Sequence, residues 1–337
     1  MQLETYENLT TSLIEEIEKF LLNSNSKFNP LFSSPLWAER LKENIDFKYR
    51  YFIIKEKSEI KALHLVFDGY RGYAKINKLP NLLKSIAKFY ARIFYGYTNW
   101  QNFIVFSKDL EKSKLTKAKE LIYVNLQNSR LLKSPIYEED ENYFKNKVTS
   151  SWGTYILDIG GKSHEEVYAK FKKQARRAIE RTKEKEVYVE LLSLDKLDKY
   201  AQWLKENQKE TGKSYKVDIE LMKKEFDVFN RKNYIYEIFI ALQDNNILGS
   251  LGIWGYGDFI SEFGVNQSRY AKENKLYIQD VIKDSIVRYM LDKNIRYYDL
   301  AGFNPSKNSN SKEKAIRQFK AKFRGQEIVY KLVGDKN

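Results

Sequence analysis

The spacing of hydrophobic and polar positions divides the first part of the chain into elements of ordinary length. Periodic apolar spacing predicts helices, and apolar–polar alternation predicts strands. The predicted elements are, in order, a helix over 5–22, a helix over 35–44, strands over 48–54 and 60–67, and a helix over 112–129. The polar segment 133–150 contains Pro135 and fits neither period. We therefore expect a boundary there between domains 1–150 and 151–337.

The second half has a clearer pattern. Ser163 and Glu166 have the spacing of a capping box, which predicts a helix that starts near His164. The expected elements are a strand over 154–159, helices over 164–183, 194–210 and 218–230, strands over 235–242, 247–254 and 259–265, a helix over 276–293, a strand over 297–300, a helix over 312–323 and a strand over 327–333. Asn245-Asn246 is expected to form the turn between the first two central strands, and Gly212 to end a helix. The order predicts an α+β fold whose last strand crosses back to the first domain.

Composition removes several classes of function. The chain has 337 residues, no cysteine and two histidines, which excludes disulfides, cysteine-based zinc sites and thiol nucleophiles. His64 lies in a predicted strand and His164 in the first turn of a helix, so we expect both to be structural. We expect no metal and no resident cofactor. The chain has Gly-Lys-Ser triplets at 161–163 and 212–214. Neither is expected to form a phosphate-binding loop, because such a loop has a glycine five positions before the glycine of the triplet, where this chain has Ile156 and Asn207.

The charge favours an anionic partner. Lys and Arg number 59 against 45 Asp and Glu, for a formal net charge of +14. Lys173, Arg176 and Arg177 lie on a predicted basic helix, which is either a solvated face or a contact for nucleic-acid phosphates. The segment 82–97 predicts a basic amphipathic helix, which either packs its apolar face into the core or lies on an anionic membrane.

The amino terminus shows no basic and apolar leader, and no apolar run approaches about 18 residues. We therefore expect a cytoplasmic monomer, with 82–97 available for peripheral contact with the inner face of the membrane.

The last third of the chain carries the most specific motifs. Tyr298–Gly302 (YDLAG) resembles the strand-end YDLGG motif of the FemABX aminoacyl (peptidyl) transferases, and Phe319-Lys320 resembles their carboxyl-terminal FK element. The basic run 171–187 is similar to their basic helix and the strand after it, with Glu186 where glycine is usual. Residues 31–37 (LFSSPLW) resemble their opening element. The resemblance covers most of the chain, apart from 68–150.

The resemblance implies two domains of the acetyltransferase (GNAT) type, in a compact form without a coiled-coil arm. It also implies transfer of an amino acid from aminoacyl-tRNA to an amine of a UDP-linked or lipid-linked muropeptide in cell-wall synthesis. Such aminolysis of an ester requires no covalent enzyme intermediate, only a positioned amine and a stabilised oxyanion.

The resemblance also assigns candidate residues. Lys320 matches the catalytic lysine of the FK element, and we expect it to stabilise the oxyanion or to contact the tRNA ribose. Lys216 matches an arginine that grips the acceptor diphosphate, although lysine lacks bidentate geometry. Arg40 or Lys42, near Trp37, stands in for a second phosphate-binding lysine. Asp299 is a further candidate near the substrate and is expected to orient the strand end.

Two other functions stay open on the sequence alone. One is an N-acyltransferase of the same fold that uses another donor, such as acyl-CoA or an acyl carrier. Residues 269–275 (RYAKENK) lack the glycines of a pyrophosphate-binding loop, which counts against acetyl-CoA. The other is a non-catalytic basic module that binds RNA.

Overall fold

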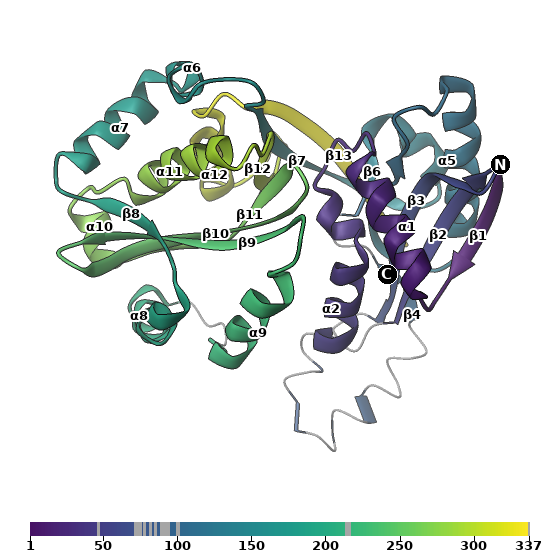
Figure 1. The fold of residues 1–337 in the computed structure, drawn as a ribbon, viewed down its shortest axis with the longest axis horizontal. Coiled ribbons are helices and arrows are strands. Elements are labelled where there is room, and N and C mark those ends of the chain that lie inside the picture. The colour runs from purple at the N-terminus through teal and green to yellow at the C-terminus, as the bar shows by residue number, and fades with distance from the viewer. Residues whose placement is uncertain are drawn as a thin grey trace. The chain divides into compact units, whose positions relative to one another are not determined.

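The computed structural model describes residues 1–45, 48–70, 76, 79–80, 83, 86–87, 95–98, 102–212 and 217–335 (Figure 1). The chain forms two compact units. Unit 1 consists of Met1–Trp152 together with Val329–Asn337, and unit 2 consists of Gly153–Ile328. The chain therefore passes from one unit to the other twice, after Trp152 and after Ile328.

Unit 1 is built on a mixed sheet with the strand order β1-β2-β3-β4-β6-β13, and β5 pairs with β3. Its strands are β1 (Gln2–Tyr6), β2 (Lys48–Glu56), β3 (Glu59–Tyr70), β4 (Tyr95–Thr98), β5 (Val105–Phe106), β6 (Leu131–Tyr137) and the part of β13 (Gln326–Gly334) from Val329 onward. Along this order the pairs are antiparallel, except that β4 and β6 are parallel. The hairpin predicted at 48–54 and 60–67 is present as β2 and β3.

The helical elements of unit 1 are α1 (Thr11–Leu22), η1 (Pro30–Ser33), α2 (Pro35–Ile45), α5 (Lys112–Gln127) and η3 (Glu138–Phe144). The predicted helix over 5–22 is wrong at its start. The side chain of Thr10 accepts a hydrogen bond from the N–H of Leu13 and begins α1, while the residues before it form β1.

The segment 133–150 is more regular than its sequence predicts, because it contains most of β6, then η3 and the start of β7 (Val148–Asp158). Strand β6 is formed by pairing with a distant part of the chain, with Tyr330 opposite Tyr137. A short strand that is interrupted by Pro135 and depends on such a partner has no regular local pattern to reveal it.

Unit 2 has a sheet of strand order β7-β12-β11-β10-β9-β8. Besides β7, its strands are β8 (Tyr188–Leu191), β9 (Tyr234–Gln243), β10 (Asn246–Tyr256), β11 (Phe259–Gln267) and β12 (Tyr297–Phe303). Only β11 and β12 run parallel. From β8 to β7, successive neighbours in this sheet are antiparallel until the parallel pair of β11 and β12, and the last pair is antiparallel again. The sheet of unit 1 has the same order of orientations from β1 to β13. The α+β class with two similarly built domains is confirmed.

The turn between β9 and β10 lies one residue earlier than predicted. Asn246 pairs with Gln243, so the turn residues are Asp244 and Asn245, whose φ angles are 50° and 61°. Asp and Asn tolerate this left-handed conformation better than most residues do, which explains why two positions fit the sequence pattern almost equally well.

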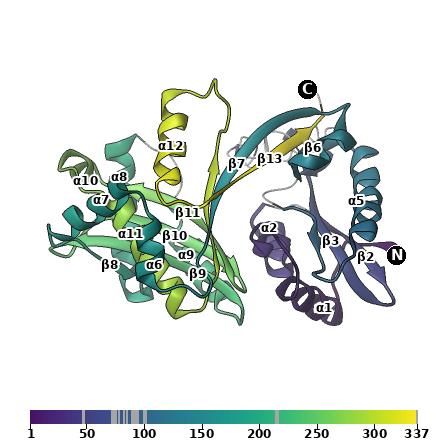
Figure 2. The same ribbon diagram turned by 90° about the horizontal axis from the view of Figure 1, so that it is seen from above.

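Helices cover both faces of the unit 2 sheet (Figures 1 and 2). They are α6 (His164–Lys170), α7 (Lys173–Lys183), η4 (Leu194–Lys196), α8 (Leu197–Thr211), α9 (Ile219–Phe229), α10 (Arg269–Glu273), α11 (Ile278–Asp292) and α12 (Ser311–Ala321). The larger core packs α7 and α11 on one face, and α8 lies on the opposite face over a second apolar cluster. Gly212 ends α8 in the left-handed conformation, as predicted.

The helix predicted over 164–183 is two helices. The capping box of Ser163 and Glu166 starts α6 as expected, but Phe171 and Lys172 take extended backbone angles and separate it from α7. The N–H of Lys172 donates to the carbonyl of Lys322, 2.8 Å away, and the Phe171 ring is buried. This tertiary contact overrides a local pattern that contains no glycine or proline.

Most of the amphipathic segment expected at 82–97 lies outside the described residues, and its end is wrong as a helix because Tyr95–Thr98 forms β4. In the part of the chain that the structure describes, no helix is both long enough and apolar enough to cross a membrane.

Glu186, where the family motif has glycine, has a φ of 60° just beyond α7. This conformation costs an L-residue about 1–2 kcal/mol, and the Glu186 side chain is exposed. We expect Glu186→Gly to raise the free energy of unfolding by about 1 kcal/mol, measured by urea denaturation. The control is Glu184→Gly, at a position with right-handed helical angles, which should not stabilise the chain. Equal effects of the two substitutions would contradict this explanation.

Candidate active site

The candidate site begins where β11 and β12 part. These parallel strands pair from Phe259 with Tyr297 to Ser261 with Asp299, and there the pairing stops. Beyond that point β12 pairs only with β7, with Gly302 opposite Thr154, while β11 continues beside β10. The carboxyl ends of parallel strands that separate in this way are a common place for ligands in sheets of this kind.

A bulge shapes the end of β12. Its register against β7 shifts between Asp299 and Gly302, and Ala301 has a φ of 60° where the family motif has glycine. The buried Asp299 carboxylate accepts hydrogen bonds from the hydroxyl of Thr154, from the hydroxyl of Ser261 at 3.3 Å and from the N–H of Ala301 at 2.8 Å. Burial raises the pKa of Asp299. These contacts describe a carboxylate that holds the strand end in place.

Lys320 reaches this strand end from α12. Its Nζ donates to the carbonyl oxygen of Gly302 at 2.9 Å, and the side chain is half-buried. Burial lowers the pKa of Lys320 to about 8, with nearby Lys283 acting in the same direction and Glu262 and Asp299 opposing it. The structure therefore brings together Lys320 and Asp299 from the predicted set. A cationic donor at the open end of two parted strands can bind a developing oxyanion.

Beneath Lys320 lies a buried ion pair that the sequence did not reveal. Lys283 of α11 is bonded to Glu262 of β11, and the hydroxyl of Tyr298 donates to the same carboxylate at 2.5 Å. The ammonium of Lys283 lies within 6.0 Å of the ring centres of Tyr298, Phe319 and Phe323. The signal was present as two charged residues at positions where the pattern calls for apolar ones.

A second ion pair continues this charged layer. Lys322 and Asp280 approach to 2.5 Å, and both side chains are buried. Burial lowers the pKa of Lys322 and raises that of Asp280. With Glu262 and Lys283, and with Asp299 and Lys320, the described part of the site balances three acids against three lysines. Paired buried charges of this kind fix the positions of their neighbours more than they add to stability.

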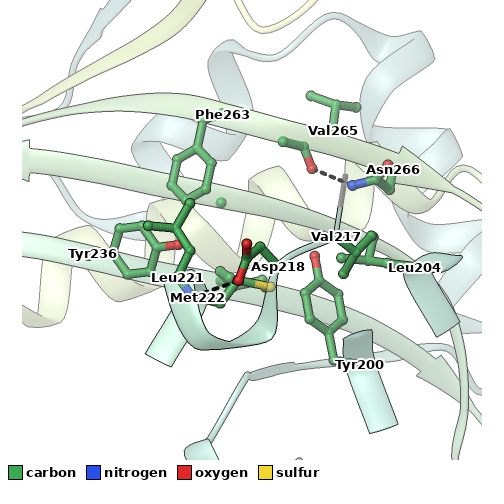
Figure 3. Close-up of a pocket in the computed structure, with 13 residues that line it drawn as sticks. Tyr200, Leu204, Val217, Asp218, Leu221, Met222, Tyr236, Phe263, Val265 and Asn266 are labelled. Atoms are coloured by element: carbon green, nitrogen blue, oxygen red, sulfur yellow. Dashed lines mark hydrogen bonds between the residues drawn. The ribbon is translucent and has the colours of Figure 1, made fainter. Parts of the chain in front are cut away.

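A pocket of about 260 Å³ opens on the sheet face that carries Phe263 (Figure 3). Ser261, two positions earlier on β11, lies on the same face of the sheet. Strands β9 to β11 and helices α8 and α9 supply its walls. Most of its lining is apolar or aromatic, including Tyr236, Phe263 and Met222. Asp218 is the one charged side chain among the lining residues, and its carboxylate caps α9 by accepting from the N–H of Leu221. Residues 213–216 precede this wall, so the predicted Lys216 lies outside the described residues.

Three predicted residues lie on α2 in unit 1. The Trp37 ring is buried, and the guanidinium of Arg40 lies over it at 4.8 Å from the ring centre. Lys42 is exposed, 3.5 Å from the carboxylate of Glu39, with its ammonium over the ring of Tyr49. The helix thus groups Trp37 with Arg40, within unit 1.

The three basic candidates on α7 differ in their surroundings. Lys173 and Arg177, one helical turn apart, are exposed. Arg176 is half-buried and donates to the carbonyl of Ala169 at 3.3 Å. Lys173 and Arg177 therefore present charge to solvent on one side of α7.

The histidines hold structural positions. His64 is buried in β3, and burial lowers its pKa to about 4. His164 lies 2.8 Å from the carboxylate of Asp284. Among the described residues, no group of three or more His, Asp or Glu side chains is arranged to hold a metal ion.

Solved structures share this architecture, with little identity in sequence. A crystal structure of FemX superposes on this chain with a TM-score of 0.61 at 12% sequence identity, and the superposition covers 97% of this chain and 96% of FemX. The chain has the fold of FemX. The carboxyl-terminal domain of a putative lysylphosphatidylglycerol synthetase from Agrobacterium fabrum is also similar, with a TM-score of 0.52 at 10% identity over 96% of this chain and 92% of that one. A tandem GNAT protein from the clavulanic acid biosynthesis pathway covers both chains completely, with a TM-score of 0.51 at 8% identity.

The FemX fold and the tandem GNAT architecture confirm the fold that the FemABX resemblance implies. No family model matches the sequence, and no curated protein matches it. At these identities the likeness is one of fold, so the chemistry has to be argued from this chain's own residues.

Proposed function

We propose that the chain is an acyltransferase that moves an aminoacyl group from aminoacyl-tRNA to an amine of a peptidoglycan precursor. The observation that carries the proposal is the position of Lys320, whose ammonium is bonded to the carbonyl of Gly302 where β11 and β12 part. Lys320 is half-buried, and within the described part of the chain its ammonium donates to a backbone carbonyl, an acceptor that it can exchange for a substrate oxygen.

The proposed reaction is aminolysis of an ester. The acceptor amine attacks the carbonyl carbon of the aminoacyl ester, a C–N bond forms, and the C–O bond to the tRNA ribose breaks. The nitrogen loses a proton, and the departing ribose oxygen gains one. Lys320 stabilises the negative charge on the carbonyl oxygen in between. Asp299, Thr154 and the Ala301 N–H fix the strand end against which Lys320 rests.

The proposal assigns substrate contacts to the basic residues of α7 and to the residues grouped on α2. In the proposal, Lys173, Arg176 and Arg177 bind tRNA phosphates, in keeping with the net charge of +14. Trp37, Arg40 and Lys42 on α2 contact the acceptor. Lys216 keeps the role of diphosphate contact that the resemblance implies. The apolar pocket beside Phe263 takes the side chain of the transferred amino acid, because it opens on the sheet face that also carries Ser261.

Another acyl donor on the same fold is the second candidate, supported by the likeness to a tandem GNAT protein. The segment after β11 weighs against acyl-CoA. Residues 269–273 form a short helix. Arg269 stands where a pyrophosphate-binding loop would have its arginine, and it is bonded to Glu273 at 2.7 Å.

The test is transfer from a pool of radiolabelled aminoacyl-tRNAs to UDP-linked and lipid-linked muropeptides, with acetyl-CoA as a parallel donor. We expect label in a muropeptide from aminoacyl-tRNA, and a rate that falls steeply with added salt because phosphate contacts are screened. The matched control is uncharged tRNA added as a competitor, which should slow transfer. Label from acetyl-CoA alone would support the second candidate, and no label from either donor in a folded sample would overturn the proposal.

A further inference from the structure

Unit 2 contains a second pocket, which shares no lining residue with the pocket beside Phe263. It has a volume of about 310 Å³. The carboxyl-terminal half of α8, the β9–β10 turn and the segment that starts α10 form its walls. None of the residues assigned above to the transfer reaction lines it.

Asn207, which lines this pocket from α8, is the decisive side chain. Its exposed fraction is 2%, and neither its Nδ2 nor its Oδ1 has a hydrogen-bond partner among the described residues. Each buried polar atom without a partner costs about 1–3 kcal/mol, so native chains seldom leave both ends of an amide unsatisfied. A ligand that offers a donor to Oδ1 and an acceptor to Nδ2 would remove this cost.

The charge of the lining points to a cation. Its three charged residues are the acids Glu206, Glu210 and Asp244, in a chain whose net charge is +14. Arg269 is bonded to Glu273 and also interacts with Glu210 of the lining, and Lys199 donates to the carbonyl of Asn245 at 3.0 Å.

The rings of Trp203 and Tyr270 complete the walls. Aromatic faces attract organic cations in addition to their apolar contact.

We infer that this pocket binds a small primary ammonium compound that carries a carbonyl oxygen close to its nitrogen, as an amino-acid amide does. The ammonium donates to Asn207 Oδ1 and lies among the three carboxylates. The ligand carbonyl accepts from Asn207 Nδ2. This binding site goes beyond the proposed transfer reaction and does not depend on it.

The inference is tested by calorimetric titration of the full chain with L-alaninamide. The neutral N-acetyl-L-alaninamide serves as the ligand control. We expect L-alaninamide to bind and the acetylated compound to bind at least tenfold more weakly, because acetylation removes the charge. Equal binding of the two compounds, or no binding of L-alaninamide, would overturn the inference.

Variants locate the site. Asn207→Leu should weaken binding at least tenfold while raising the melting temperature of the unliganded chain, since it removes two unsatisfied polar atoms at similar volume. Glu206→Gln with Glu210→Gln should also weaken binding, and Glu220→Gln, an exposed acid on α9 outside the lining, should not. Lys320→Ala should bind the amide like the wild type, which separates this result from the fate of the transfer proposal. Unchanged affinity in Asn207→Leu would contradict the assignment.

Discussion

Replacing Lys320 by alanine is expected to slow aminoacyl transfer by about 10²–10³-fold, the usual loss when one oxyanion donor is removed. The affinity for the acceptor should change little, because the substituted group acts on the transition state. The measurement is single-turnover transfer from charged tRNA. Lys314→Ala, an exposed lysine on the same helix, is the matched control and should retain the wild-type rate. A wild-type rate in Lys320→Ala would remove the catalytic assignment.

The pH dependence of the transfer rate distinguishes a catalytic role of Lys320 from a purely structural one. Because the pKa of Lys320 is about 8, the proposed cation is lost as the pH rises above that value. The wild-type rate should therefore fall on the alkaline side. Lys320→Arg keeps its charge to higher pH, so its lower rate should lack this fall.

A further substitution, Lys320→Met, tests the effect of the Lys320 charge on stability. Between pH 8 and 10.5 the unfolded chain still holds a proton on Lys320 that the folded chain has released, so wild-type stability rises with pH there. Lys320→Met should lack this rise. At pH 7 it should be more stable than the wild type by about 2 kcal/mol, after the lost hydrogen bond to Gly302 is subtracted.

Replacing Lys283 by alanine is expected to lower the free energy of unfolding by about 3–5 kcal/mol. The side chains of Lys283 and Glu262 are 2% and 3% exposed, so the substitution leaves a carboxylate in the core without its cation. Urea denaturation measures the loss. As the control, Glu273→Ala breaks the exposed pair with Arg269 and should cost less than about 1 kcal/mol.

A double variant distinguishes a lost charge partner from a lost side chain. Glu262→Gln combined with Lys283→Met removes both charges and should recover most of the stability that Lys283→Ala loses. If the double variant is no more stable than Lys283→Ala, the effect belongs to packing and not to the uncompensated charge.

Local patterns were sufficient for much of unit 2. Alternation located β9, β10 and β11, the capping box of Ser163 and Glu166 located α6, and Gly212 marked the end of α8. In each case the deciding interaction lies within a few residues or follows from one-sided burial. Lys320 differs, because only its resemblance to a family motif separates it from many other lysines.

Features that depend on distant partners were missed. The break between α6 and α7 depends on the carbonyl of Lys322, and β6 depends on β13. Glu262 and Lys283 were assigned no role because charged residues usually indicate surface, and their pairing joins a strand to a helix that follows it. A charged residue at an apolar position can be noticed in the sequence, but its partner is identified only once the fold brings the two together.

The chain returns from unit 2 to unit 1 after Ile328, so the last segment of unit 1 is synthesised after the whole of unit 2. The segment after Val329 pairs with β6, and Asp335 accepts from the N–H of Leu131 and from Lys147. The sequence of unit 2, in contrast, is contiguous from Gly153 to Ile328. Unit 2 is therefore complete in sequence before unit 1, and the edge of β6 that β13 covers stays unpaired until this last segment folds back.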